Sequence, residues 1–153
     1  MKQLLRPNFK AQIITHVKEL DFALRMIWLG KGGVYLPSDL EALKGGNWFP
    51  INTDHFELLP GVNIYWVGGH TPGSIMLSVE SEKGNVIFTG DFIHLPDELN
   101  VEMKGWLLMD SDEYLNGMKR LKLMMRRPNT KLVISHDPKI WEKYPKAPTP
   151  LIS

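Results

Sequence analysis

The chain has 153 residues, of which 43% are apolar and 23% are charged, and this is enough to bury the hydrophobic core of about one domain. Its 18 basic and 17 acidic side chains are well mixed and leave a net charge of +1, and no apolar run approaches the roughly 20 residues of a membrane span, so we expect neither nucleic acid nor a membrane as a partner. Without any cysteine the chain cannot form disulfides, thiolate metal sites or cysteine nucleophiles, and we expect a single cytoplasmic domain over residues 1–153.

The first part of the chain predicts one strand and two helices. A short strand over 11–15 is followed by apolar residues at helical spacing over 17–28, and a run of glycines ends this helix. His16 lies at the helix start, where a capping or surface role is favoured over a role as metal ligand. A second, short helix is expected over 39–44, with Ser38 as its cap.

From Asp54 onward the pattern changes from helical to extended. Runs rich in β-branched and aromatic residues are separated by turn-forming residues, and they predict a meander of antiparallel strands. His55 lies at the start of the first run, where a structural or surface role is favoured. The expected strands cover residues 56–59, 63–67, 75–79 and 86–89.

The last third of the chain predicts a loop, a helix and a strand. The loop from Asp91 to about Lys104 is long enough to be functional, because compact domains keep few long structureless loops. Residues 111–125 have the spacing of an amphipathic helix that ends in basic residues and a proline. A final strand is expected over 131–135, before a proline-rich tail that begins near Trp141.

Three of the expected strands are each followed by a potential metal ligand, namely His70, Asp91 and His136. These side chains can meet only if the three strands end at one edge of a sheet. Two imidazoles and a carboxylate suit zinc, iron or manganese, and a carboxylate can bridge two ions. Each residue also has a simpler explanation, since His and Asp often cap the turn that follows a strand.

The motifs around these residues resemble those of the metallo-β-lactamase superfamily, and within it the N-acyl-homoserine lactonase group. The resemblance implies an αββα sandwich, a fold of the α/β (α+β) class. It also implies two metal ions, usually zinc, whose bridging hydroxide attacks the carbonyl of a lactone or ester. The matching segments are 69–74 (GHTPGS), 89–91 (TGD) and 134–137 (ISHD), with Pro138 and Trp141 beyond them.

Site roles follow from the resemblance motif by motif. His70 would bind the first metal, Asp91 would bridge both metals, and His136 would bind the second. The lactonases have a tyrosine three residues after the bridging aspartate that helps to orient the substrate. This chain has His94 there, which can still donate a hydrogen bond, so Asp91 and His94 are the expected catalytic residues. Ser74 replaces the second histidine of the family's turn.

The superfamily's first motif, His-x-His-x-Asp-His, does not occur in the chain. That motif supplies four ligands and should precede the strand at 11–15. We therefore expect a C-terminal portion of a lactonase-like enzyme, with an incomplete sandwich, an incomplete zinc or other divalent-metal site, and weak or no activity as an isolated chain. A lactone or ester substrate and a missing N-terminal half would then be its partners.

Two other interpretations remain open at this point. The chain could be a catalytically silent homologue that folds as a homodimer and buries an exposed sheet edge. Alternatively, the three ligands could hold a single ion, with water and His94 completing its coordination.

Overall fold

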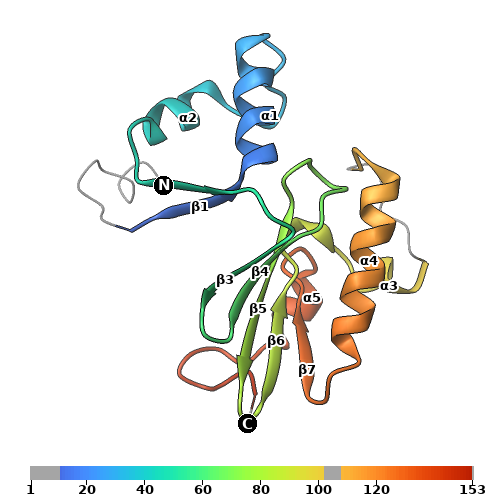
Figure 1. Cartoon of the computed structure of the whole chain (residues 1–153). Helices are drawn as coiled ribbons and strands as arrows, with labels where there is room; N and C mark the ends of the chain where they lie inside the picture. Colours follow the sequence, from blue (N-terminus) through green and yellow to red (C-terminus); the bar gives the residue numbers. More distant parts are fainter. Residues whose placement is uncertain (1–10, 102–107, 153) are drawn as a thin grey trace. The chain divides into compact units, whose positions relative to one another are not determined.

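The computed structural model describes residues 11–101 and 108–152, and the chain divides into two compact units, Met1–Asn52 and Thr53–Ser153. Figure 1 shows the elements of each unit in sequence colours. The single domain expected over 1–153 stays a prediction. Among the described residues no helix has both the length and the hydropathy to cross a membrane.

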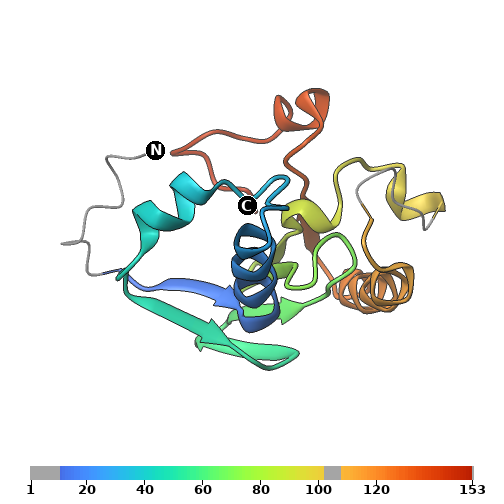
Figure 2. The ribbon, with the colours of Figure 1, turned by 90° about the horizontal axis from the view of Figure 1, so that it is seen from above.

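The first unit is a small parallel sheet with helices on one side, as both Figure 1 and Figure 2 show. His16 ends the first strand and caps the helix that follows, because its Nδ1 accepts the backbone N–H of Lys18 at 3.3 Å, and the side chain is buried. The capping role predicted for His16 is therefore confirmed. The elements are β1 (Ile13–His16), α1 (Val17–Trp28), α2 (Pro37–Leu43) and β2 (Trp48–Ile51).

Two details of this unit differ from the sequence prediction. Ser38 is not a cap, because α2 already begins at Pro37, whose fixed φ suits a first helical turn, and Leu36 is the cap residue without a side-chain bond. Strand β2 was not predicted, since Pro50 lies inside it and proline lowers the strand signal. It pairs in parallel with β1 from Ile13 opposite Trp48 to His16 opposite Ile51.

The second unit contains a five-stranded sheet in the order β3-β4-β5-β6-β7. The first four strands are antiparallel neighbours in chain order, so the predicted meander is confirmed. The last strand is added in parallel to β6, with Phe88 opposite Val133. The strands are β3 (His55–Leu59), β4 (Val62–Trp66), β5 (Ile75–Ser81), β6 (Gly84–Phe88) and β7 (Thr130–Val133).

Helix α4 (Ser111–Met125) has the predicted bounds and lies along one face of this sheet (Figure 1). Met118 and Leu121 of the predicted apolar stripe are buried in the core, whereas Leu115 and Met125 are exposed. The predicted 91–104 loop instead contains a 3₁₀ turn, Gly90–Phe92, and a short helix α3, Glu98–Val101, and its end lies outside the described residues. The buried core consists of Val67, Met76, Ile87, Phe92, Ile93, Tyr114, Met118, Leu121, Met124 and Ile134.

The tail after β7 contains one more short helix, α5 (Pro138–Trp141), which was not predicted. Asp137 caps it by accepting the backbone N–H groups of Lys139 and Ile140 at 2.9 and 3.3 Å. Proline at the first position is pre-organised for a helix, so the signal lay in Asp137-Pro138 rather than in the spacing of apolar residues.

Truncation of one core side chain on α4 should destabilise the second unit strongly. Met118 is 1% exposed within the core cluster, so Met118→Ala is expected to lower the free energy of unfolding by about 2–5 kcal/mol. Leu123 lies on the same helix and is 61% exposed, so Leu123→Ala should change it by less than about 0.5 kcal/mol. Urea unfolding followed by circular dichroism measures both, and equal losses would contradict the assignment of the buried face.

Candidate metal centre

The structure brings together the three side chains that follow strands β4, β6 and β7. Nε2 of His70 lies 3.7 Å from Oδ2 of Asp91, and Nε2 of His136 lies 3.5 Å from Oδ1 of the same carboxylate. The side chain of His70 is 11% exposed, whereas those of Asp91 and His136 are about half exposed at 56% and 46%. The group is therefore mostly buried at His70 and open to solvent at Asp91 and His136.

The two distances to Asp91 are closer to those between ligands of one metal ion than to those of hydrogen bonds. Both exceed the usual 2.7–3.2 Å of an N–H···O hydrogen bond. Bonds of about 2.0–2.2 Å at tetrahedral angles would place two ligand atoms of one zinc ion about 3.3–3.6 Å apart, which is close to both values. Each oxygen of Asp91 faces a different imidazole, and this is the arrangement that a bridging carboxylate needs.

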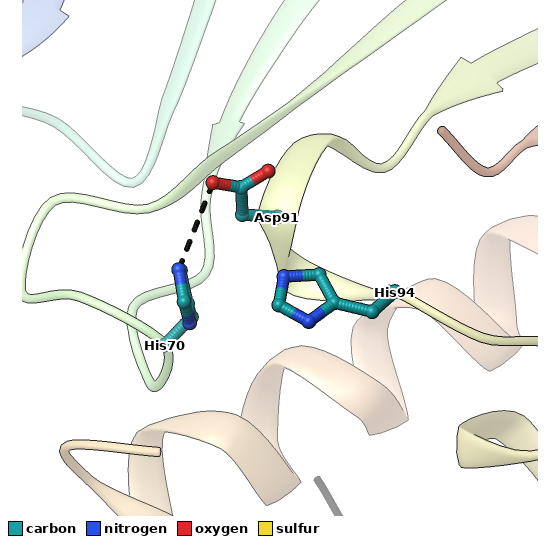
Figure 3. A group of neighbouring side chains, drawn as sticks. All are labelled: His70, Asp91 and His94. Carbon is teal, nitrogen blue, oxygen red and sulfur yellow. Dashed lines mark ion pairs between the residues drawn. The ribbon is translucent and has the colours of Figure 1, made fainter. Parts of the chain in front are cut away.

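His94 belongs to the same cluster. One ligand atom each of His70, Asp91 and His94 lie within 4.8 Å of one another. Figure 3 shows His70 and His94 approaching the space beside Asp91 from different segments. The His94 ring centroid is 5.1 Å from that of His70 and 4.3 Å from that of His136. Three imidazoles and one carboxylate thus form one group of potential metal ligands.

The loop that carries His70 is pressed against the start of α4. Gly69 has φ of +77°, and a Cβ atom there would lie 2.7 Å from Cα of Tyr114. Its carbonyl oxygen accepts the N–H groups of Met109 and Asp110 at 2.8 and 3.0 Å, and its own N–H donates to Oε2 of Glu113 at 3.3 Å. Both polar groups of the residue before His70 are therefore held, one by the two residues that precede α4 and the other by Glu113 in its first turn.

Ser74 closes the same loop from its other end. Its hydroxyl accepts the backbone N–H of Thr71 at 3.0 Å and lies 2.8 Å from the Thr71 hydroxyl. Its carbonyl oxygen accepts the N–H groups of Val67 and Gly68 at 2.9 and 3.1 Å. The serine that stands where the family's turn has a second histidine therefore has a structural task here.

The segment that carries Asp91 and His94 is fixed by buried groups. The hydroxyl of Thr89, which is fully buried, lies within hydrogen-bond distance of two carbonyl oxygens, that of Ile93 at 3.3 Å and that of Val133 at 3.2 Å. The buried carboxylate of Glu98 accepts the backbone N–H of His94 at 2.9 Å. Glu98 was not predicted as a site residue. The only feature of the sequence that points to it is its acidic side chain, four positions after His94.

His136 follows an anchored stretch of β7. The hydroxyl of Tyr144 accepts the N–H of Ile134 at 2.8 Å and donates to the carbonyl oxygen of Leu132 at 3.2 Å. Nδ1 of His136 lies 3.1 Å from the hydroxyl of Ser135, so Nε2 is the nitrogen that faces Asp91. Tyr144 was also missed, because nothing in the proline-rich tail marks it for contact with β7.

Tyr114, the aromatic residue behind the His70 loop, is not a candidate for acid or base chemistry. Burial raises the pKa of its phenol well above the ordinary value, and the negative charge of Glu98 raises it further. The ring is 1% exposed and packs on Phe92 at 5.0 Å between centroids. It therefore stays protonated and acts as part of the core.

The other two histidines have structural contacts of their own. His16 caps α1 in the first unit, as described above. His55 lies 2.7 Å from Oδ1 of Asn63 through its Nε2 and stacks on Tyr65 at 4.7 Å between centroids. The structural role favoured for His55 agrees with these contacts.

Comparison with known proteins assigns the family. A family model described as the metallo-beta-lactamase superfamily matches residues 5–136. The chain belongs to this superfamily. The resemblance noted in the sequence is therefore confirmed, and so is the mixed α and β fold class that it implied.

Its relatives include proteins named N-acyl homoserine lactonases. The N-acyl homoserine lactonase AttM of Azorhizobium caulinodans is 25% identical over 143 residues, which cover 88% of this chain and 54% of that protein. An N-acyl homoserine lactonase of a Bacillus species is 32% identical over 83 residues, which cover 54% of this chain and 33% of that protein. The chain thus spans about half the length, or less, of the curated relatives that it matches.

The fold is also that of a solved lactonase structure. A mutant of AiiA from B. thuringiensis, with N-decanoyl-L-homoserine bound at its active site, superposes with a TM-score of 0.77 at 24% identity. The match covers 92% of this chain and 52% of that one. At this identity the likeness establishes the fold.

Alanine substitutions at Gly69 and at Gly90 should separate the energetic cost of a steric clash from the cost of a strained backbone. A methyl group at Gly69 would be forced into Tyr114 and would keep a left-handed φ, so Gly69→Ala is expected to cost about 2–5 kcal/mol of unfolding free energy. Gly90 has φ of +53° but its nearest neighbour would lie 3.4 Å away, so Gly90→Ala should cost only about 1–2 kcal/mol. Chemical unfolding of both variants measures the difference, and equal costs would show that the contact with α4 is not tight.

Proposed function

We propose that this chain forms part of a divalent-metal-dependent hydrolase that acts on lactones or related esters, with N-acyl homoserine lactones as the first substrates to test. The observation that supports it best is the carboxylate of Asp91, whose two oxygens face His70 and His136 at 3.7 and 3.5 Å. Membership of the superfamily and the lactonase relatives support the choice of substrate.

The donor set fits a divalent metal. Imidazole nitrogens and carboxylate oxygens are common ligands of zinc, manganese and iron, and the separations found here suit ligands that share an ion. Half-exposed Asp91 and His136 leave one side of the group accessible to substrate and water. We propose zinc as the resident metal, for which His70 would be a ligand of a first ion, His136 a ligand of a second ion and Asp91 a ligand of both.

Within this proposal the residues have distinct roles. A divalent ion, when bound, lowers the pKa of a water molecule and polarises a carbonyl group. Hydrogen bonds to both polar groups of Gly69 hold the backbone next to His70, and the Tyr144 hydroxyl holds the backbone at Ile134, two residues before His136. Asp91 connects the two, and Asp91 and His94 are the residues that we place at the reacting atoms.

A second candidate role is self-association without catalysis. The first unit exposes large apolar side chains, among them Trp28 at 89% and Val34 at 76%. Exposed apolar area of this kind favours contact with another protein surface, and a second copy of this chain is the partner that we consider. Sedimentation analysis decides it, because a stable monomer at micromolar concentration excludes this role.

The proposed hydrolase is tested by metal content and by hydrolysis of N-hexanoyl homoserine lactone and of a chromogenic ester. The chain, reloaded with zinc and assayed alone and together with a candidate N-terminal half, should hydrolyse at least one of them in one of these two states and lose that activity to a chelator. Asp91→Asn removes the negative charge that holds the cation and should lower kcat/KM at least about 100-fold.

The matched control for this experiment is His55→Ala, which removes an imidazole outside the cluster and should retain both zinc and activity. Absence of bound zinc in the wild-type chain, or hydrolysis that survives both the chelator and Asp91→Asn, would contradict the proposal.

A further inference from the structure

We propose that His94 is itself a metal ligand, so that His70, Asp91 and His94 together hold one divalent ion. The inference rests on the proposed function for the presence of a metal, and it goes further by assigning a third protein ligand to that metal. The resemblance to the lactonases gave this position only a substrate-orienting role.

The first argument is distance. Ligand atoms of the three residues lie within 4.8 Å of one another without an ion between them. Two ligands of one tetrahedral zinc lie about 3.3–3.6 Å apart, so the widest pair has to close by at most roughly 1.5 Å. A small rotation of the half-exposed Asp91 side chain can supply such a change. Figure 3 shows that a ring nitrogen of His94 is directed toward the gap between the other two residues.

The second argument is that the backbone of His94 is held in place. The two preceding residues, Phe92 and Ile93, are 0% exposed in the core. The His94 N–H donates to the buried Glu98 carboxylate, and the Thr89 hydroxyl lies 3.3 Å from the Ile93 carbonyl oxygen. A metal ligand needs support of this kind, because buried hydrogen bonds around a site orient its ligands and raise its affinity.

The third argument is the number of ligands. Catalytic zinc sites usually have three protein ligands and one open position. His70 and Asp91 alone provide two, and His94 raises the number to three. Two imidazoles and one carboxylate with open positions are also a ligand set that iron(II) uses. His136, which faces the other oxygen of Asp91, remains available to support the carboxylate or a second ion.

Packing between imidazole rings is the simplest competing explanation. His94 contacts the ring of His136 at 4.3 Å with an angle of 38° between planes, which would by itself keep His94 in the cluster. Under that explanation loss of the ring affects stability but not the affinity for metal. Metal affinity is therefore the quantity that separates the two explanations.

The experiment is a zinc titration of the metal-free chain against a chromophoric chelator, at fixed pH. The variants are His94→Ala, His94→Gln, His70→Ala and the control His55→Ala. Removal of a ligand should weaken zinc binding at least about 100-fold, so we expect that loss for His94→Ala and for His70→Ala. His94→Gln keeps a hydrogen-bonding group of similar reach but replaces the imidazole by a poor zinc ligand, and it should lose affinity as well. His55→Ala should bind zinc as the wild type does.

A second readout guards against a folding defect. Thermal unfolding in the presence of EDTA reports the metal-free stability of each variant. The visible spectrum of the cobalt(II)-loaded protein reports the ligands, and in the wild type it should differ from that of His94→Gln. A variant that unfolds like the wild type in EDTA but binds zinc weakly supports the proposal.

The possible failures are distinguishable. Wild-type zinc affinity in His94→Ala, together with loss in His70→Ala, overturns the role of His94 and leaves the proposed metal centre intact. If His94→Gln binds zinc as the wild type does while His94→Ala does not, His94 has a hydrogen-bonding role, and its proposed role as metal ligand is likewise overturned. If the wild-type chain binds no zinc, both this inference and the proposed function are wrong.

Discussion

Burial of α4 against the five-stranded sheet determines where the polar residues of the site lie. Each of them is close in sequence to a member of that core. Val67 precedes His70 by one short turn, Phe92 and Ile93 separate Asp91 from His94, and Ile134 comes shortly before His136. These apolar residues lie just after strands β4, β6 and β7. Because they pack together in one cluster, the ends of these three strands lie close to one another. Hydrophobic burial, which has no directional preference of its own, thus produces a directed group of polar side chains.

Hydrogen bonds then refine the positions that packing sets. The two polar groups of Gly69, the carboxylate of Glu98 and the hydroxyl of Tyr144 each hold the main chain next to one side chain of the cluster. None of these contacts involves the atoms that face Asp91. Much of the conformational entropy of the site is therefore lost on folding and not when a ligand binds, which favours tight binding of a small cation.

The sequence predicted most of the second unit, since the period-two pattern of the meander and the 3.6-residue spacing of α4 are strong signals. It was weaker where one residue decides the structure, as with Pro37 at the start of α2 or Pro50 inside β2. The four polar side chains of the cluster could be named from their motifs. Supporting groups such as Glu98 and Tyr144 could not, because their partners are backbone atoms, and backbone atoms leave no mark in the sequence.

The contact between Tyr144 and β7 also bears on how the molecule meets other molecules. Within the described residues β7 is an outer strand of its sheet, and outer strands offer unpaired N–H and C=O groups to any passing chain. The phenol occupies the N–H of Ile134 and the carbonyl of Leu132, two groups of the kind that an added strand would use. Backbone pairing is thereby discouraged at the end of β7 that leads to His136.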